Sequence, residues 1–200
     1  MKKITILFLN VIFVNLLFSN SFKLHLLFTN NIHGAIHEVP ARFINPEFSP
    51  ILAGGAGAFT YASKIRKEAK LKEDFVMLTD AGNIFQGSQL GTYDGGSNII
   101  KWMNWMAYDA IVPGVRDFDQ GVNNLSKLAS EANFPFLASN LEGVDGIEDY
   151  KIINANGVKI GLIGLITPFI SEGLLPEYYE GVAVSDIMKT LNTQIEKIRS

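Results

Sequence analysis

Apolar segments typical of strands alternate with amphipathic helical segments along most of this chain, and this alternation is what most constrains its fold. The first strand-like segment, residues 23–29, is almost wholly apolar and is predicted to be buried. Three more strands and three helices are predicted after it: strands at 75–79, 109–113 and 134–141, and helices at 54–71, 98–107 and 122–132. Because such alternation builds βαβ units, the predicted fold class is α/β with a parallel sheet.

The last part of the chain departs from this pattern. Two strand-like segments, 150–155 and 158–166, flank Asn156-Gly157, which is the strongest short signal for a hairpin with a type I′ turn. A final helix begins near Ser185 or Asp186, either of which suits the N-cap. Its apolar residues recur on one face: Ile187, Leu191, Ile195 and Ile198. No strand follows this helix, so the sheet is expected to be incomplete at its C-terminal end.

Residues 1–21 have the layout of a secretory signal peptide. Two lysines precede an apolar stretch over 4–18, and small residues follow that suit cleavage. The alternative is an uncleaved anchor, but fifteen residues interrupted by two asparagines are too few to span a membrane. The predicted domains are therefore a signal peptide at 1–21 and one domain at 22–200, exported to a periplasm or to the extracellular space.

Charge and cysteine content exclude some kinds of partner. Removing Lys2 and Lys3 leaves 15 of the 17 basic residues against 20 acidic ones, and this acidic balance argues against nucleic acid. The chain has no cysteine, which excludes disulfides and thiolate metal sites.

Polar residues gather in the loops that follow three successive predicted strands. These residues are Asn31 and His33, Asp80 and Asn83, and Arg116, Asp117 and Asp119. Because ligands bind at the carboxyl ends of strands in open α/β sheets, the three loops are expected to meet in space.

Several segments in a fixed order resemble the bacterial 5′-nucleotidase, UDP-sugar hydrolase and 2′,3′-cyclic phosphodiesterase family of calcineurin-like metallophosphoesterases. The segments are 29–34, 54–57, 80–88, 114–121, 134–141 and 158–168. The resemblance implies a calcineurin-like metallophosphoesterase sandwich that is incomplete at the C-terminus and lacks the family's C-terminal nucleotidase domain.

The same resemblance implies which positions would bind metal, and most of them have changed. His33 matches a family ligand, but Asn31 occupies the position of a ligating aspartate. Asn83 occupies the position of the aspartate that bridges two metals, and Val115 that of a ligating asparagine. Arg116 stands where the family has its catalytic histidine. The remaining family ligands lie beyond the segment that this chain matches.

Loss of the bridging carboxylate at Asn83 has the largest predicted consequence. Two dications about 4 Å apart repel by roughly 16 kcal/mol at an effective dielectric constant of 20, and an amide supplies no charge to offset this. No catalytic residue and no cofactor are therefore expected, beyond at most one weakly bound divalent metal, Mn or Zn, held by His33. The alternative for His33 is an ordinary loop histidine that makes hydrogen bonds.

Arg116 has two interpretations. Its guanidinium suits an anion, which it would bind through bidentate hydrogen bonds. Alternatively it pairs with Asp80, Asp117 or Asp119 and fills the space that the metals would take.

The leading functional hypothesis is an exported, catalytically inactive relative of this family, a pseudoenzyme that serves as a binding or interaction module. Its expected partners are a second copy of itself or another protein, with phosphate or a nucleotide as a candidate ligand. One alternative is an active metal-dependent phosphoesterase or nucleotidase of altered specificity, either single-metal or completed by a second chain. A decaying gene product is the other.

Overall fold

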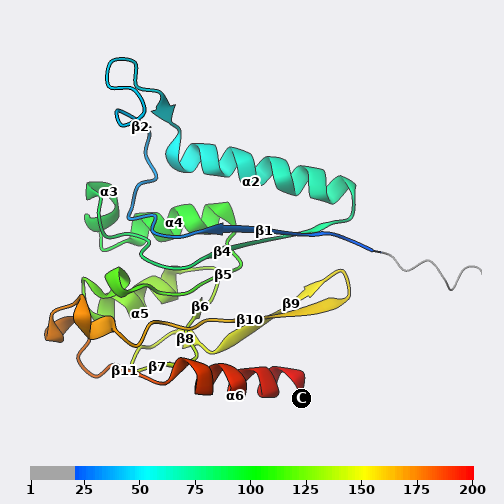
Figure 1. The fold of residues 1–200 in the computed structure, drawn as a ribbon, viewed down its shortest axis with the longest axis vertical. Coiled ribbons are helices and arrows are strands. Elements are labelled where there is room, and N and C mark those ends of the chain that lie inside the picture. Colours follow the sequence, from blue (N-terminus) through cyan, green and yellow to red (C-terminus); the bar gives the residue numbers. More distant parts are fainter. Residues whose placement is uncertain (1–20) are drawn as a thin grey trace, which may run out of the picture.

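A five-stranded parallel sheet forms the centre of the computed structural model, which describes residues 21–200 (Figure 1). Residues 1–20 of the predicted signal peptide lie outside the described residues. The strand order is β1-β4-β5-β6-β8, and each neighbouring pair is parallel. Their bounds are β1 Leu24–Thr29, β4 Phe75–Asp80, β5 Ala110–Ile111, β6 Phe136–Leu137 and β8 Ile147–Glu148. The predicted α/β class with a parallel sheet is confirmed.

Three helices connect these strands and cover one face of the sheet. They are α2 Gly54–Leu71, α4 Ser97–Met106 and α5 Val122–Glu131. Helix α4 buries Ile99, Met103 and Met106 almost completely, as their three- and four-residue spacing predicts. These side chains and those of α5 form the main hydrophobic core with the sheet.

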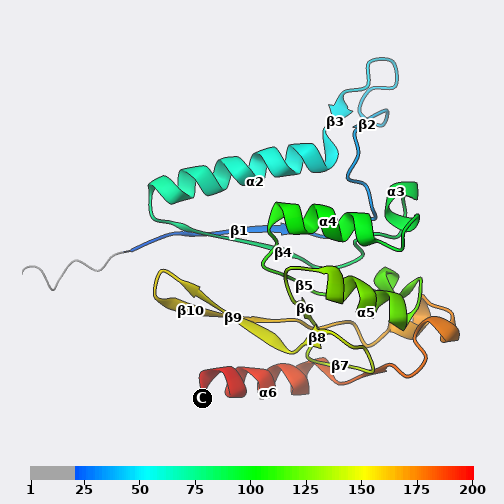
Figure 2. The same ribbon diagram turned by 180° about the vertical axis from the view of Figure 1, so that it is seen from behind.

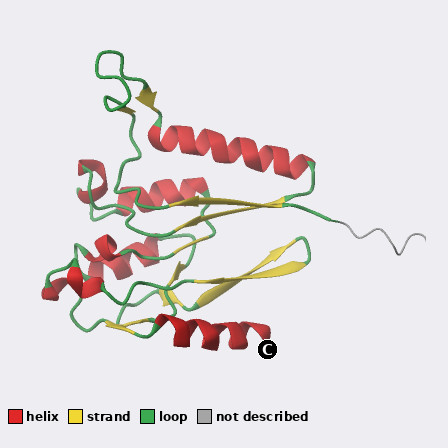
Figure 3. Ribbon diagram, in the orientation of Figure 1, coloured by secondary structure: helices red, strands yellow, loops and turns green. Residues whose placement is uncertain are grey.

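An antiparallel hairpin, β9 Tyr150–Ala155 and β10 Val158–Ile163, lies on the other side of the sheet, with helix α6 Ile187–Arg199 outside it (Figures 1 and 2). Asn156 and Gly157 have φ values of 51° and 91°, as the predicted type I′ turn requires. Asp186 caps α6 by accepting a 2.7 Å bond from the Lys189 amide. Figure 3 shows the resulting sequence of layers, with helices outside and strands inside.

The prediction of a buried first strand is wrong. The side chains of Leu24, Leu26 and Phe28 are 43%, 53% and 73% exposed, whereas those of alternate residues point to the helical side. The reason is positional: β1 is the edge strand of the sheet, and one of its faces remains exposed. An apolar strand sequence indicates that both faces of the strand can be buried, but it does not show that another layer covers each of them. Among the described residues, one face of β1 has no covering layer.

Several short elements were not predicted. The segment between β1 and α2 opens into a projecting arm in which β2 Val39–Pro40 pairs with β3 Ile51–Leu52 (Figure 1). A second small sheet pairs β7 Leu141–Glu142 with β11 Ala183–Val184. The remaining elements are helices of three or four residues: α3 Gln89–Thr92, η1 Val115–Phe118, η2 Ile170–Glu172 and η3 Pro176–Tyr178. Within residues 21–200, no helix combines the length and apolar character that crossing a membrane requires.

Candidate functional site

The three polar loops meet at the carboxyl ends of β1, β4 and β5, as predicted. The Asn31 amide donates to the Gly82 carbonyl at 2.9 Å, and the His33 amide donates to the Asn83 carbonyl at 3.0 Å. The third loop contacts the second through Gly82 and Gly114. A Cβ atom on Gly82 would lie 2.3 Å from the Gly114 nitrogen, so no larger residue fits at this crossing.

Asn31 and Asn83 are hydrogen-bonded directly to each other. The Asn83 Nδ2 donates to Asn31 Oδ1 at 2.7 Å, and the Asn83 Oδ1 accepts from the Arg116 amide at 2.9 Å. Both asparagines have left-handed backbone conformations, with φ values of 55° and 59°, which asparagine tolerates better than most residues. The two carboxamides therefore connect all three loops by neutral hydrogen bonds.

Asp117 organises the same loops from beneath. Its side chain is fully buried and accepts three backbone bonds: from Asn83 at 2.8 Å, Ile84 at 2.7 Å and Gly114 at 2.8 Å. In the sequence Asp117 is one of three polar residues of its loop, with Arg116 and Asp119, and nothing there predicted this role. An acidic residue three positions after Gly114, at the start of the short helix η1, was the available signal.

Asp80 anchors the end of β4 in a second buried network. Its carboxylate accepts a 2.6 Å bond from the Gly82 amide and a bond from the Thr29 hydroxyl. The Thr29 hydroxyl also lies 2.8 Å from the Tyr108 hydroxyl. Nothing in the sequence pointed to Tyr108, because it lies outside the three loops and is apolar in pattern.

Burial raises the pKa of both carboxyl groups. It raises the pKa of Asp80 to about 6, and the nearby charge of Asp117 adds to the effect, while bonds from Thr29 and Gly82 oppose it. Burial also raises the pKa of Asp117 to about 6, against the lowering effect of its three backbone donors and of His33. These two acids thus carry less negative charge at mildly acidic pH than exposed aspartates would.

The other predicted site residues have separate surroundings. The His33 Nδ1 donates to the Gln86 carbonyl at 2.7 Å. Val115 is half-buried and packs against the main hydrophobic core. The Arg116 guanidinium is about half exposed and lies 3.6 Å from the Asp119 carboxylate, one of the three acids considered as its partner.

This set of donors does not fit a two-metal centre. Asn31 and Asn83 each contribute a neutral amide oxygen that already accepts a hydrogen bond, and Val115 has no donor atom. Asp80 and Asp117 use their oxygens to hold backbone amides and a hydroxyl. Across residues 21–200, no three His, Cys, Asp or Glu side chains are grouped so that they would hold a metal ion.

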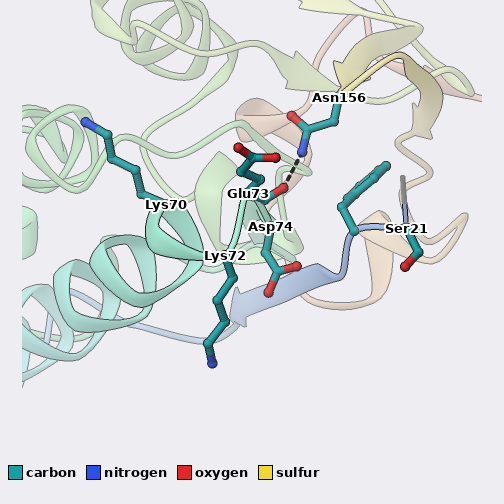
Figure 4. Close-up of a pocket in the computed structure, with 7 residues that line it drawn as sticks. Ser21, Lys70, Lys72, Glu73, Asp74 and Asn156 are labelled. Atoms are coloured by element: carbon teal, nitrogen blue, oxygen red, sulfur yellow. Dashed lines mark hydrogen bonds between the residues drawn. The ribbon is translucent and has the colours of Figure 1, made fainter. Parts of the chain in front are cut away.

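A further hollow lies at the opposite end of β1 from these loops, and Figure 4 shows residues that line it. It has a volume of about 660 Å³ and is lined by residues that include Lys70, Lys72 and Asp74. The two lysine side chains point in different directions, and Asp74 is already bonded to the Lys23 amide and to His25. These mixed and satisfied charges give no convergent set of groups for a ligand.

Comparison with known proteins shows similarity to 5′-nucleotidases. The chain is 34% identical over 158 residues to the snake venom 5′-nucleotidase of Crotalus adamanteus, a match that covers 74% of this chain and 26% of the relative. It is 28% identical over 195 residues to the 5′-nucleotidase of Rattus norvegicus, covering 91% of this chain and 32% of the relative. The chain thus spans about a quarter to a third of the length of these curated relatives. No family model matches it.

Solved structures show the same fold. The 5′-nucleotidase precursor of Thermus thermophilus superposes with a TM-score of 0.73 at 23% identity, over 88% of this chain and 34% of the other. The calcineurin-like phosphoesterase YfkN of Bacillus subtilis superposes with a TM-score of 0.65 at 25% identity, over 87% and 57%. The predicted calcineurin-like fold is therefore confirmed, and it accounts for part of each of these proteins.

Proposed function

We propose that this chain, a relative of the 5′-nucleotidases with the calcineurin-like phosphoesterase fold, is a catalytically inactive member that serves as a binding or interaction module. The observation that carries the proposal is the hydrogen bond between the Asn83 and Asn31 side chains, together with the bond from the Arg116 amide to Asn83. At these positions the family resemblance implies metal ligands. In this chain the same side chains hold the loops together by themselves, so the loops need no metal charge to keep their arrangement.

Electrostatics support the same proposal. A two-metal site requires negative ligands between the ions, because the repulsion between two dications is large even at an effective dielectric constant of 20. The nearest carboxylates, Asp80 and Asp117, are buried and have raised pKa values, and both hold backbone groups. Without the metal ions no bound water is polarised into a nucleophile, so the hydrolytic step has no attacking group.

Calorimetric titration of the metal-free protein with Mn²⁺ and then Zn²⁺ tests this proposal. We expect no binding tighter than about millimolar, because a single imidazole and neutral amides hold such ions weakly. Micromolar binding that disappears in His33→Ala would contradict the proposal and favour the alternative of an active phosphoesterase. A screen of nucleotide and phosphodiester hydrolysis would then decide between that enzyme and a metal-binding protein without activity.

Phosphate or a nucleotide is the candidate ligand of this module, and Arg116 is the group that would bind it. Its guanidinium is half exposed and has one acidic neighbour, Asp119, at the long distance of 3.6 Å, so several of its five N–H donors remain available. Calorimetric titration with inorganic phosphate measures this binding, and Arg116→Ala is the matched variant. Equal heats from the two proteins would remove Arg116 from the proposal.

We also propose that the chain is exported, with residues 1–21 removed as a signal peptide. The support is the charged start, the apolar stretch and the small residues at its end. The N-terminal residue of protein recovered from the periplasm or medium should be Phe22. Protein that keeps Met1 and remains with the membrane fraction would favour the uncleaved anchor.

A further inference from the structure

The projecting arm between β1 and α2 carries exposed apolar side chains on its tip, residues 42–49. Phe43, Ile44 and Phe48 are 83%, 60% and 84% exposed. In Figures 1 and 2 the arm stands off from the rest of the molecule, beyond the N-terminal end of α2. Large apolar side chains gathered on one projecting segment mark a contact with another apolar body, whereas single exposed ones do not.

The backbone donors of this tip are bonded within the arm itself. The Asn45 Oδ1 accepts from the amides of Glu47 and Phe48, each at 3.0 Å. Other amides donate to carbonyl groups of the arm: Ala41 to Pro50, Arg42 to Pro40, and Ile44 and Asn45 to Ala41. The prolines at 40, 46 and 50 have no amide hydrogen to satisfy. Most N–H groups of the tip therefore need no partner outside the arm.

These two properties together favour a lipid surface over a protein partner. A segment that enters hydrocarbon must satisfy its backbone groups internally, because no water is there to pair with them. The exposed parts of the three side chains amount to roughly 400 Å², well below the 1,200–2,000 Å² that stable protein complexes bury. Insertion into a bilayer has no such minimum, since each buried apolar side chain adds to the binding.

The charges of the chain indicate which kind of lipid surface fits. The charged residues of the tip are Arg42 and Glu47, which have opposite signs, and long side chains of this kind can keep their charged ends in water. Without Lys2 and Lys3 the chain has 15 basic and 20 acidic residues, so anionic lipid does not attract it as a whole. The surface that fits is therefore zwitterionic.

We propose that the tip of the arm inserts Phe43, Ile44 and Phe48 into the surface of a zwitterionic lipid bilayer. Three side chains give weak and reversible binding, no stronger than that of a single acyl chain. This contact goes beyond the proposed function and lies on a different part of the chain from the three loops. The metal and phosphate titrations therefore do not bear on it.

Co-sedimentation with phosphatidylcholine vesicles tests the proposal on protein that begins at Phe22. A fraction of the protein should sediment with the vesicles, and this fraction should change little between about 50 and about 500 mM salt, because insertion is apolar. Phe48→Ala should lower the partition coefficient at least about tenfold. Phe28→Ala is the matched control, since Phe28 is 73% exposed on β1, and it should leave the partition unchanged. Circular dichroism checks that each variant is folded.

Fluorescence quenching reports insertion itself. Phe48→Trp should keep the binding, and brominated phosphatidylcholine should quench its emission more than that of the wild type, in which Trp102 and Trp105 provide the baseline. Bound Phe48→Trp protein that is quenched no more than the wild type would show that the tip stays outside the bilayer, and would overturn the proposal.

Three further results would overturn it as well. Wild-type protein that never sediments with vesicles would leave a protein pocket as the partner of the tip. Binding that Phe28→Ala abolishes and Phe48→Ala keeps would place the contact on β1. Binding that requires anionic phosphatidylglycerol and disappears with salt would make the contact electrostatic rather than apolar.

Discussion

Replacing Asp117 with alanine is expected to lower the free energy of unfolding by about 4 kcal/mol at pH 7. The reason is that three backbone amides, those of Asn83, Ile84 and Gly114, lose their only acceptor inside a buried loop cluster. Each buried donor without a partner costs about 1 to 3 kcal/mol. Urea-induced unfolding followed by circular dichroism measures the change.

Asp119→Ala is the matched control for this prediction. Asp119 belongs to the same loop, and its one ion pair is with the half-exposed Arg116 at 3.6 Å. Because this ion pair is long and its arginine is half exposed, the variant should lose less than about 1 kcal/mol. Equal losses in the two variants would mean that Asp117 has no special role in holding the loops.

The same carboxyl group should leave a signature in the pH dependence of stability. Burial raises the pKa of Asp117 to about 6 in the folded protein, above its ordinary value of 3.8, so the folded state binds more protons than the unfolded state between these values. The proton-linked part of its contribution to stability is therefore present at low pH and is lost as pH rises through about 6, while the three backbone hydrogen bonds contribute at both ends of this range. The difference in stability between the wild type and Asp117→Ala should accordingly grow from pH 7 to pH 4. A constant difference would show that Asp117 keeps an ordinary pKa.

Restoring two carboxylates should give the protein a metal site. In the double variant Asn31→Asp and Asn83→Asp, the hydrogen bond between the two side chains is replaced by repulsion between two anions that a dication relieves. We expect Mn²⁺ to bind at least about 100-fold more tightly than to the wild type, which corresponds to about 2.7 kcal/mol. Both positions have left-handed backbone that aspartate also tolerates, so the loops should keep their shape.

Calorimetry and the metal dependence of thermal unfolding measure this gain. The control adds the same two charges elsewhere, through Asn123→Asp and Asn192→Asp on exposed positions of α5 and α6, and should bind no more tightly than the wild type. Hydrolysis of nucleotides is not expected to appear, because Val115 and Arg116 would still occupy two positions at which the family resemblance implies functional residues. A double variant that binds Mn²⁺ no better than the control would mean that the loops have moved too far to form the site.

The sequence predicted those helices and strands that are long enough to show a periodic pattern of apolar residues. Helix α4 buries the apolar residues that recur at intervals of three and four along it. The hairpin turns at Asn156-Gly157 because both residues accept positive φ. The meeting of the three loops also followed from the order of strands in a parallel sheet. The strands β5, β6, β7 and β11 are only two residues long, so no periodicity could fix their bounds.

The sequence predicted that the three loops meet, but it did not predict which residues hold them together. Asp117 and Asp119 are the same residue type two positions apart, yet one is fully buried beneath three amides and the other pairs with Arg116 near the surface. The bond between Asn31 and Asn83 joins residues 52 positions apart, and no local pattern encodes which of their atoms meet.

The succession of strands and helices and the hairpin turn could be predicted from the amino-acid sequence, because they depend on local conformation, and the residue types at Asn31, Asn83 and Val115 support the prediction that metal ligands are missing there. That β1 is an edge strand with one exposed face, that the two asparagines bond to each other, and that Asp117 supports the loops became visible in the folded arrangement. Burial and hydrogen-bond partners are properties of neighbours in space, and distant segments supply those neighbours.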